Sequence, residues 1–234
     1  MSGYTLYFSP GACSRVSLIA LEEIGVPFEA RVVNFMAGEH RSPEYLAQNP
    51  QGKVPLLRVG DEPLTETVAI LSYLDGRHPE ARLLPRNTSA LARAHVLEQL
   101  VWCTSGLHPI ITRIRLPQMF CDHAEGRERL RELSMQAMAP NFAIIERRLA
   151  AGGWALGDWS MLDAYYYWVW YRTCVGSGFD TTPYPHYAAH ARRVEQRPSV
   201  QRALARERAA MQQLAAENLA PKMGPLGIDE VAAG

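Results

Sequence analysis

The sequence has no long hydrophobic run and no excess of charge of one sign. No uncharged apolar segment approaches the ~20 residues that span a bilayer, and residues 1–4 lack the basic and apolar regions of a signal peptide. Lys plus Arg and Asp plus Glu number 24 each, without a basic stretch that would neutralise a run of phosphates. We therefore expect a cytoplasmic protein that binds neither nucleic acid nor membrane.

Cysteine is scarce as well. Cys13, Cys103, Cys121 and Cys174 are widely spaced and form no C-x-x-C pair. A disulfide framework or a zinc knuckle needs a closer pattern, so we expect free thiols. The sequence also contains no H-E-x-x-H motif, no H-x-H pair and no glycine-rich phosphate loop, and we therefore expect no bound metal.

Apolar residues are abundant, at 47% of the 234 residues, which is enough for a packed core. Over residues 1–78, alternating and helical apolar spacings predict the order βαβαββα. The predicted strands span residues 4–8, 28–33, 54–59 and 62–65, and the predicted helices span residues 15–24, 43–48 and 66–75. A helix between the first two strands predicts parallel pairing, whereas the short turn between the last two predicts an antiparallel hairpin. This order is typical of a thioredoxin-like α/β domain.

The pattern changes after residue 78. A polar stretch with prolines over residues 79–88 predicts a linker, and no convincing strand signal follows it. Helical spacing recurs over residues 89–121, 126–149, 162–174, 187–196 and 199–214. We therefore expect an all-α domain over residues 89–216 and a C-terminal tail over residues 217–234.

Two features of the helical domain concern its folding. Ser160 and Asp163 have the Ser-x-x-Asp spacing of a capping box, in which each side chain bonds the other residue's backbone amide. The aromatic block over residues 165–171 is too continuous to face one way on a helix. We therefore expect part of this block in the core and part at a cleft or an interface.

Several separated segments resemble the glutathione transferase superfamily in order and spacing. They are residues 7–14 (YFSPGACS), 49–55 (NPQGKVP), 64–74 (LTETVAILSYL), 102–109 (WCTSGLHP) and 157–164 (GDWSMLDA). The first segment is most like the bacterial beta class, in which a cysteine stands where other classes use tyrosine or serine. The resemblance covers residues 4 to about 205. It implies a thioredoxin-like N-terminal domain plus an all-α C-terminal domain, glutathione as co-substrate, and a homodimer.

Cys13 is the predicted catalytic thiol. It stands where the first predicted helix begins, so unpaired amides and the helix dipole can favour its thiolate. On position alone, a small buried core cysteine is equally consistent. The resemblance implies a thiolate that attacks a disulfide or holds the sulfur of glutathione. Ser9 and Ser14 are alternative hydroxyl donors.

The resemblance implies that the middle and the glycyl end of glutathione bind to two loops of the first domain. Val54 and Pro55, with a cis peptide bond between them, would pair with the cysteinyl backbone as an added strand. Lys53 and His40 would assist at the glycyl end. The alternatives are that Pro55 only begins a strand, where proline is tolerated, and that His40 is simply exposed to solvent.

Glu66 and Thr67 open a predicted helix, where a hydroxyl and unpaired amides form a site for a carboxylate. The resemblance implies that Thr67 binds the γ-glutamyl carboxylate and that Glu66 meets its ammonium group. The alternative is that Thr65 or Thr67 is an ordinary helix cap. Relatives usually have serine after the glutamate, and Thr67 keeps the hydroxyl.

The resemblance also implies an acceptor-substrate site that includes Phe8, His108 and Arg172. His108 is expected to be catalytic, because an imidazole can hydrogen-bond a thiolate or polarise an electrophile. The alternative is that His108 makes a surface or interhelix contact. Phe8 lies next to the position where beta-class relatives carry tyrosine, and it offers no hydroxyl.

The expected function is that of a glutathione S-transferase acting in detoxification. The enzyme would use the glutathione thiolate on a small hydrophobic or electrophilic molecule, by conjugation or in thiol-disulfide or peroxide chemistry. The sequence does not distinguish these from ether cleavage, dehalogenation or isomerisation. The alternative is a non-catalytic binding or scaffold protein of the same fold. The joint presence of Cys13, Val54, Pro55, Glu66 and Thr67 argues against that alternative.

Overall fold

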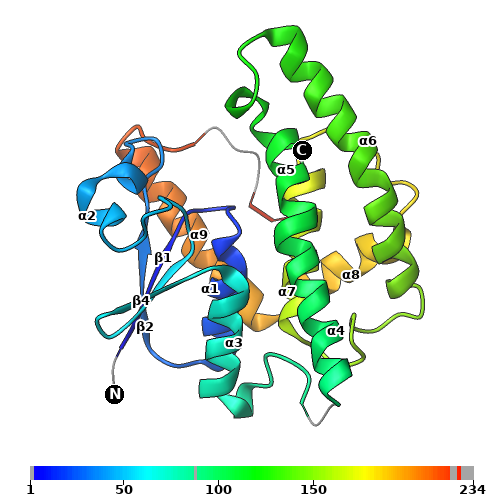
Figure 1. The fold of residues 1–234 in the computed structure, drawn as a ribbon, viewed down its shortest axis with the longest axis horizontal. Coiled ribbons are helices and arrows are strands. Elements are labelled where there is room, and N and C mark those ends of the chain that lie inside the picture. The colour runs from blue at the N-terminus through cyan, green and yellow to red at the C-terminus, as the bar shows by residue number, and fades with distance from the viewer. Residues whose placement is uncertain (1–2, 87–88, 222–225, 228–234) are drawn as a thin grey trace. The chain divides into compact units, whose positions relative to one another are not determined.

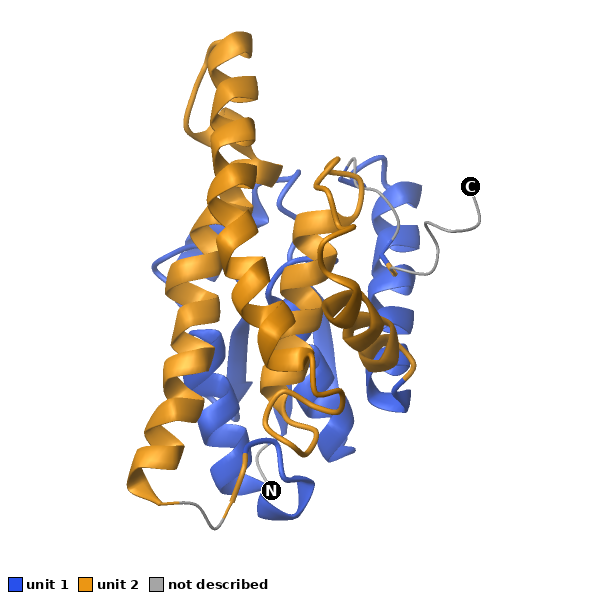
Figure 2. Ribbon diagram, turned by 90° about the vertical axis from the view of Figure 1, so that its right-hand side faces the viewer, with its two compact units in different colours: residues 1–84, 197–226 blue, residues 85–196, 227–234 orange. Residues whose placement is uncertain are grey.

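The chain forms two compact units. The structure is a computed structural model that describes residues 3–86, 89–221 and 226–227. Unit 1 comprises residues 1–84 and 197–226, and unit 2 comprises residues 85–196 and 227–234 (Figure 2). The predicted linker, 79–88, and the predicted tail, 217–234, lie partly outside the described residues.

Unit 1 is built on a four-stranded sheet with the strand order β2-β1-β3-β4 (Figure 1). The strands are β1 (Tyr4–Phe8), β2 (Phe28–Val32), β3 (Leu56–Val59) and β4 (Glu62–Thr65). β1 pairs with β2 in parallel and with β3 in antiparallel orientation, and β3 and β4 form an antiparallel pair. The predicted succession of elements, the parallel pairing of β1 with β2 and the antiparallel pairing of β3 with β4 are confirmed.

The helices of unit 1 begin and end at residues with clear local roles. They are α1 (Ser14–Ile24), α2 (Pro43–Leu46), α3 (Thr67–Arg77) and α9 (Pro198–Ala216), with short 3₁₀ helices η1 (Glu39–Arg41) and η2 (Pro79–Ala81). α1 ends at Gly25, whose φ of 75° is left-handed. α2 begins after Ser42, whose hydroxyl accepts a hydrogen bond from the Tyr45 amide.

The C-terminal helix α9 packs against α1 within unit 1 (Figure 1). Glu22 of α1 forms ion pairs with Arg202 and Arg206, and Glu23 pairs with Arg197. These contacts group residues 197–226 with the thioredoxin-like part of the chain. The sequence-based layout, which placed residues 89–216 in one helical domain, stays a prediction.

The named secondary-structure elements in the described part of unit 2 are all helices, with two isolated β-bridges in the segment 154–158. Its elements are α4 (Ala90–Val101), the π-helix η3 (Trp102–Leu107), α5 (His108–Arg115), the 3₁₀ helix η4 (Pro117–Met119), α6 (Ala124–Leu149), α7 (Met161–Cys174) and α8 (Pro185–Glu195). The predicted helix over residues 89–121 is therefore interrupted. Gly106 lets the Trp102 ring lie close to the backbone of the π-helix, because a Cβ at position 106 would lie 2.7 Å from Trp102 Cδ1. None of the described helices of the chain combines the length and the apolar character needed to cross a bilayer.

The core of unit 2 forms around α7. Every aromatic residue of the block 165–171 is buried, so the expectation that part of this block lies at a cleft or an interface is wrong for the described structure. The predicted capping box of Ser160 and Asp163 is confirmed. Asp163 also accepts a hydrogen bond from the Ala155 amide at 2.7 Å and lies 2.8 Å from His190 Nε2. Asp163 therefore joins α7 to α8 and to the segment before α7.

Because Asp163 has several buried partners, its removal is expected to cost more than removal of its capping partner. Asp163→Ala should lower the free energy of unfolding by about 3 kcal/mol or more, since it leaves buried donors unpaired. Ser160→Ala should lower it by about 1 kcal/mol, the usual value of a cap. Urea unfolding followed by circular dichroism measures both values. Equal losses for the two variants would contradict this account.

Candidate functional site

Cys13 occupies the N-cap position of α1, at the end of a tight turn that follows β1. The Ser14 hydroxyl closes this turn, because it donates to the Ser9 carbonyl at 3.3 Å and accepts from the Ser9 amide at 3.2 Å. Ser14 is fully buried, so its hydroxyl serves the turn and does not support a role as a substitute for Cys13. The Cys13 side chain is half-buried, and its thiol donates to the Val54 carbonyl oxygen at 3.4 Å.

The segment before β3 is held by side chains from α2 and the loop after it. The peptide bond between Val54 and Pro55 is cis, as the resemblance implied. The Lys53 carbonyl accepts two hydrogen bonds, from the Tyr45 hydroxyl at 2.6 Å and from Asn49 Nδ2 at 2.7 Å. Burial raises the pKa of Tyr45 to about 12, so its hydroxyl keeps the proton that it donates. These bonds fix the backbone next to the Cys13 thiol.

Sequence reasoning missed Asn49 and Tyr45 as supports of this segment. Asn49 is almost fully buried, and its Oδ1 also accepts from the Gln51 amide at 3.1 Å. Its place at the start of the NPQGKVP segment was a signal that a buried asparagine organises the turn. The hydrogen bond from the Tyr45 hydroxyl to the Lys53 carbonyl joins two separate segments, so no local sequence pattern predicts it.

His40 packs against the same segment through Gly52. Gly52 has a φ of +60°, and a Cβ there would lie 2.7 Å from the His40 carbonyl oxygen. The His40 ring stacks on Phe35 with centroids 4.3 Å apart, and its Nε2 accepts from Arg41 Nε at 3.3 Å. Burial, and then the charge of Arg41, lower the pKa of His40, so the ring is neutral at pH 7. Its proton then lies on Nδ1, which is buried and has no hydrogen-bond partner within the described residues.

The start of α3 holds Glu66 and Thr67 in an unusual backbone geometry. Glu66 has φ 68° and ψ 119°, a sparsely populated region for a residue with a side chain. Its exposed carboxylate accepts a hydrogen bond from Gln51 Nε2 at 3.3 Å. The N-cap residue is Glu66, whose side chain does not cap the helix, so the alternative of Thr65 or Thr67 as the cap residue is wrong. Thr67 is the first helical residue and is buried.

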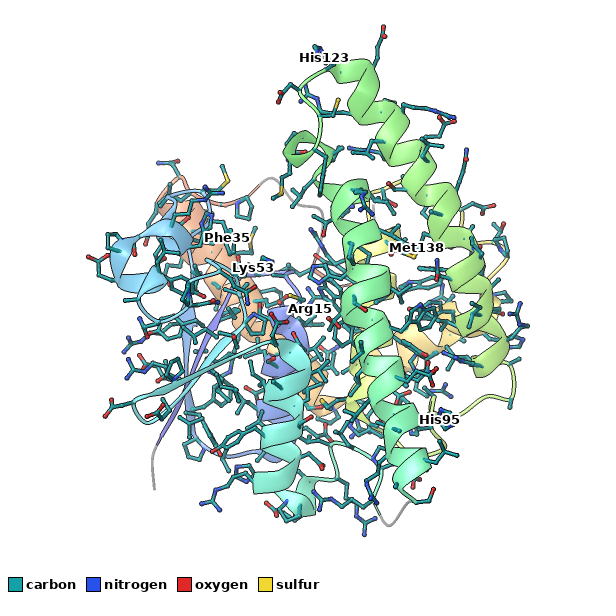
Figure 3. The ribbon with its side chains drawn as sticks, in the orientation of Figure 1. Arg15, Phe35, Lys53, His95, His123 and Met138 are labelled. Atoms are coloured by element: carbon teal, nitrogen blue, oxygen red, sulfur yellow. The ribbon has the colours of Figure 1, made fainter. Side chains whose placement is uncertain are left out.

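Unit 1 therefore brings together the residues that the sequence analysis assigned to glutathione. Cys13 meets Val54, Gly52 brings His40 against the segment before Val54, and Gln51 from the same segment reaches Glu66. The Lys53 side chain is exposed and is labelled in Figure 3. The roles of these residues stay predictions.

The candidates for the acceptor site lie in different surroundings. In unit 2, the His108 and Trp168 rings pack in a T-shaped arrangement, with centroids 4.8 Å apart and planes at 71°. Arg172 follows Trp168 by one turn of α7 and shares its face of the helix. In unit 1, Phe8 is only 2% exposed. A role for Phe8 in contact with a substrate stays a prediction that needs this ring to become accessible.

The other cysteines differ from Cys13 in their surroundings. Burial raises the pKa of the Cys103 and Cys174 thiols, so both stay protonated at neutral pH. Cys121 lies in the turn between α5 and α6, where its thiol lies 3.6 Å from the His123 carbonyl oxygen. Within the described ranges, no three or more His, Cys, Asp or Glu side chains gather in a way that could hold a metal ion.

Similarity to known proteins agrees with this geometry. Residues 2–76 match the family described as glutathione S-transferase, N-terminal domain. The chain is also 34% identical over 161 residues to maleylacetoacetate isomerase from Pseudomonas aeruginosa, across 68% of this chain and 74% of the relative. The chain belongs to the glutathione S-transferase family. The resemblance seen in the sequence is confirmed.

Two solved structures of this enzyme family support the fold over almost their whole length. A glutathione transferase homologue from sulfitobacter with bound glutathione has a TM-score of 0.77 and 31% identity, covering 88% of this chain and 99% of its own. The bacterial beta class glutathione S-transferase of Sphingomonas chungbukensis has a TM-score of 0.73 and 31% identity, covering 87% and 98%. The predicted glutathione transferase fold and the likeness to the beta class are both confirmed.

The contrast between the thiols yields a direct chemical test. Iodoacetamide at pH 8 should modify Cys13 in the folded transferase, because its thiol is half-buried and lies at a helix start. Cys103 should stay unmodified, because burial keeps its thiol protonated and inaccessible. Peptide mass spectrometry measures both, with urea-unfolded protein as the control in which every cysteine reacts. Modification of Cys103 as fast as Cys13 in the folded protein would contradict this reading.

Proposed function

We propose that this protein is a glutathione S-transferase that binds glutathione in unit 1 and uses its thiolate on an electrophilic small molecule. The observation that carries the proposal is the 3.4 Å distance between the Cys13 thiol and the Val54 carbonyl oxygen. A peptide that pairs with the Val54 backbone through its middle residue brings that residue's side chain close to Cys13. Glutathione has its cysteine in the middle, so its sulfur would arrive beside the Cys13 sulfur.

The γ-glutamyl end of glutathione carries both an ammonium group and a carboxylate. Thr67 would bind the carboxylate with its hydroxyl and with the amides at the start of α3, where the helix dipole adds about 0.3–1 kcal/mol. Glu66, oriented by its hydrogen bond from Gln51, would bind the ammonium group. The strained backbone of Glu66 supports this role, because such strain is common at ligand sites.

The glycyl carboxylate of glutathione would bind to Lys53 and His40. The Lys53 side chain is exposed and carries a positive charge. The neutral His40 ring carries a buried Nδ1–H group that has no partner in the described structure, and a carboxylate would accept its hydrogen bond once this atom becomes accessible. Gly52 keeps this loop close to the segment that carries Lys53.

Cys13 would act on the glutathione sulfur in one of two ways. In conjugation, its thiol hydrogen-bonds the glutathione thiolate, which attacks the electrophile. In disulfide chemistry, the Cys13 thiolate attacks a disulfide of glutathione, forms a mixed disulfide and releases one glutathione thiolate. Amide donors and the helix dipole at the start of α1 would favour the thiolate of Cys13. His108 and Arg172 of unit 2 would act on the second substrate. The enzyme would work in detoxification in the cytoplasm.

Removal of the Cys13 sulfur separates these two modes. Cys13→Ala should lower kcat/KM for reduction of a small disulfide by about a hundredfold, because the nucleophile is lost. Conjugation of glutathione to an aryl halide should fall by about tenfold, the value of one lost hydrogen bond to a charged group. Steady-state kinetics measure both, with Cys121→Ala as the matched control. If both activities survive in Cys13→Ala, the assignment of Cys13 is wrong.

The likeness to maleylacetoacetate isomerase favours isomerisation as a second candidate reaction. A glutathione thiolate that adds to a conjugated double bond, allows rotation and then leaves would isomerise a substrate without forming a stable conjugate. Mass spectrometry of the product distinguishes the two reactions, because only conjugation increases the mass.

Retention on a glutathione column without turnover of any thiol-reactive substrate would favour the scaffold alternative.

We also propose a homodimer that uses the exposed face of α4. Leu91, Ala94, Leu97 and Val101 recur every three or four residues on this helix, and all of them are exposed. An apolar stripe of this kind on a soluble helix marks an interaction surface. His95, labelled in Figure 3, lies on the same helix next to this stripe.

A charge within the α4 stripe should prevent dimer formation. The double variant Leu97→Glu/Val101→Glu should sediment as a monomer at micromolar concentration, because two carboxylates would be buried unpaired. Leu133→Glu changes an exposed leucine on α6 and should leave the dimer intact. Sedimentation velocity measures the outcome. A monomeric parent protein, or a dimeric double variant, would refute this interface.

A further inference from the structure

One carboxylate on α9 contacts both sides of the segment that carries Cys13. Glu207 Oε1 accepts a hydrogen bond from the Gly11 amide at 3.1 Å. Glu207 Oε2 accepts from Arg15 Nε at 3.0 Å and from Arg15 Nη2 at 2.5 Å. The side chains of Arg15 and Glu207 are fully buried. Gly11 and Arg15 lie two residues before and two residues after Cys13, and Arg15 is labelled in Figure 3.

We propose that Glu207, together with Arg15, is a positioning residue for the Cys13 thiol. The C-terminal helix α9 is then part of the thiol site, although Glu207 is 192 residues from Arg15 in the sequence. The effect on glutathione depends on the function proposed above. The effect on the Cys13 thiol does not, because it follows from contacts within unit 1 alone.

The attachment of α9 to α1 does not depend on this buried pair. Near the other end of α1, Glu22 already forms ion pairs with two arginines of α9, and Glu23 forms one with Arg197, the N-cap residue of α9. That end lies roughly 10 Å from Arg15 at 1.5 Å per helical residue. A buried ion pair is also weak evidence for stability, because desolvation offsets much of its attraction. What distinguishes Glu207 is that its two oxygens bind donors on both sides of one thiol.

The contact with Gly11 explains how this pair would place the thiol. Gly11 is left-handed, with a φ of 70°, and in this conformation its amide donates to Glu207. Without Glu207 the Gly11 amide loses a buried acceptor, and the turn between β1 and α1 can relax. The Cys13 thiol would then move relative to the Val54 carbonyl oxygen. A displacement of about 1 Å at a reacting group can change a rate by up to a hundredfold.

The test uses double variants, which avoid an unpaired buried charge. Arg15→Met/Glu207→Leu replaces the pair by apolar side chains and removes the acceptor for Gly11. Arg15→Met/Glu207→Gln also removes both charges but keeps an acceptor for the Gly11 amide. Glu22→Gln/Arg202→Met is the matched control, because it removes the two ion pairs of Glu22 from the same helix interface and leaves Arg15 and Glu207 in place. The measurements are thermal unfolding, the rate of Cys13 alkylation by iodoacetamide, and KM and kcat for glutathione.

The leucine variant should change the Cys13 alkylation rate by about fivefold or more and raise the KM for glutathione. The glutamine variant should restore the alkylation rate to within about twofold of the parent, and the control should match the parent throughout. A folded leucine variant with the parent alkylation rate overturns the proposal.

If the leucine variant does not fold, Glu207→Asp is measured in its place, and the same change in the alkylation rate of Cys13 is expected. This change keeps the charge but is one methylene too short to reach both donors. If the parent protein does not bind glutathione but the variant still alters the alkylation rate of Cys13, the positioning role is supported and the proposed function is refuted.

Discussion

The meeting of the Cys13 thiol and the Val54 carbonyl depends on the antiparallel pairing of β1 and β3. Tyr7 of β1 lies opposite Leu56 of β3, so the end of β1 and the start of β3 lie at the same edge of the sheet. The chain leaves β1 toward Cys13 and enters β3 from Val54, which brings the two groups to that edge. Any shift in this register would move one group away from the other.

Side chains from separate elements fix the backbone on both sides of this contact. Tyr45 and Asn49 fix the Lys53 carbonyl, and Ser14 closes the turn that precedes Cys13. Each of these side chains is buried and hydrogen-bonded, so each has one well-defined orientation. A site of this kind holds its reacting groups in place before any ligand arrives, which reduces the entropy lost on binding.

Much of the fold and part of the site were predictable from the sequence. The succession of strands and helices in residues 1–78 follows from spacing and turn residues, and the capping box of Ser160 and Asp163 follows from a short local motif. Cys13 and the segment from residue 49 to residue 55 are recognisable because their residues are contiguous and resemble a known family. Such patterns consist of neighbouring residues, so they can be recognised from the sequence alone.

Features that join distant residues could not be predicted in the same way. Helical spacing in residues 199–214 predicts a helix with an apolar face, but it does not say that this face meets α1. The Glu207 contact with Gly11 has no sequence signal, because a glutamate in a helix normally faces solvent. The burial of the whole α7 aromatic block could not be predicted either. A helix surrounded on all sides by other elements loses the amphipathic pattern from which burial is inferred.

The discontinuity of unit 1 has a consequence for the order in which the protein is made. Residues 1–84 contain every strand of the sheet, but the helix that completes the unit lies after residue 196. Synthesis proceeds from the N-terminus, so the ribosome releases the sheet long before it releases Glu207. During that interval the Gly11 amide and the Arg15 guanidinium lack the carboxylate that both contact in the finished protein. A nascent chain that stops short of α9 would carry Cys13 without the Glu207 contacts to Gly11 and Arg15.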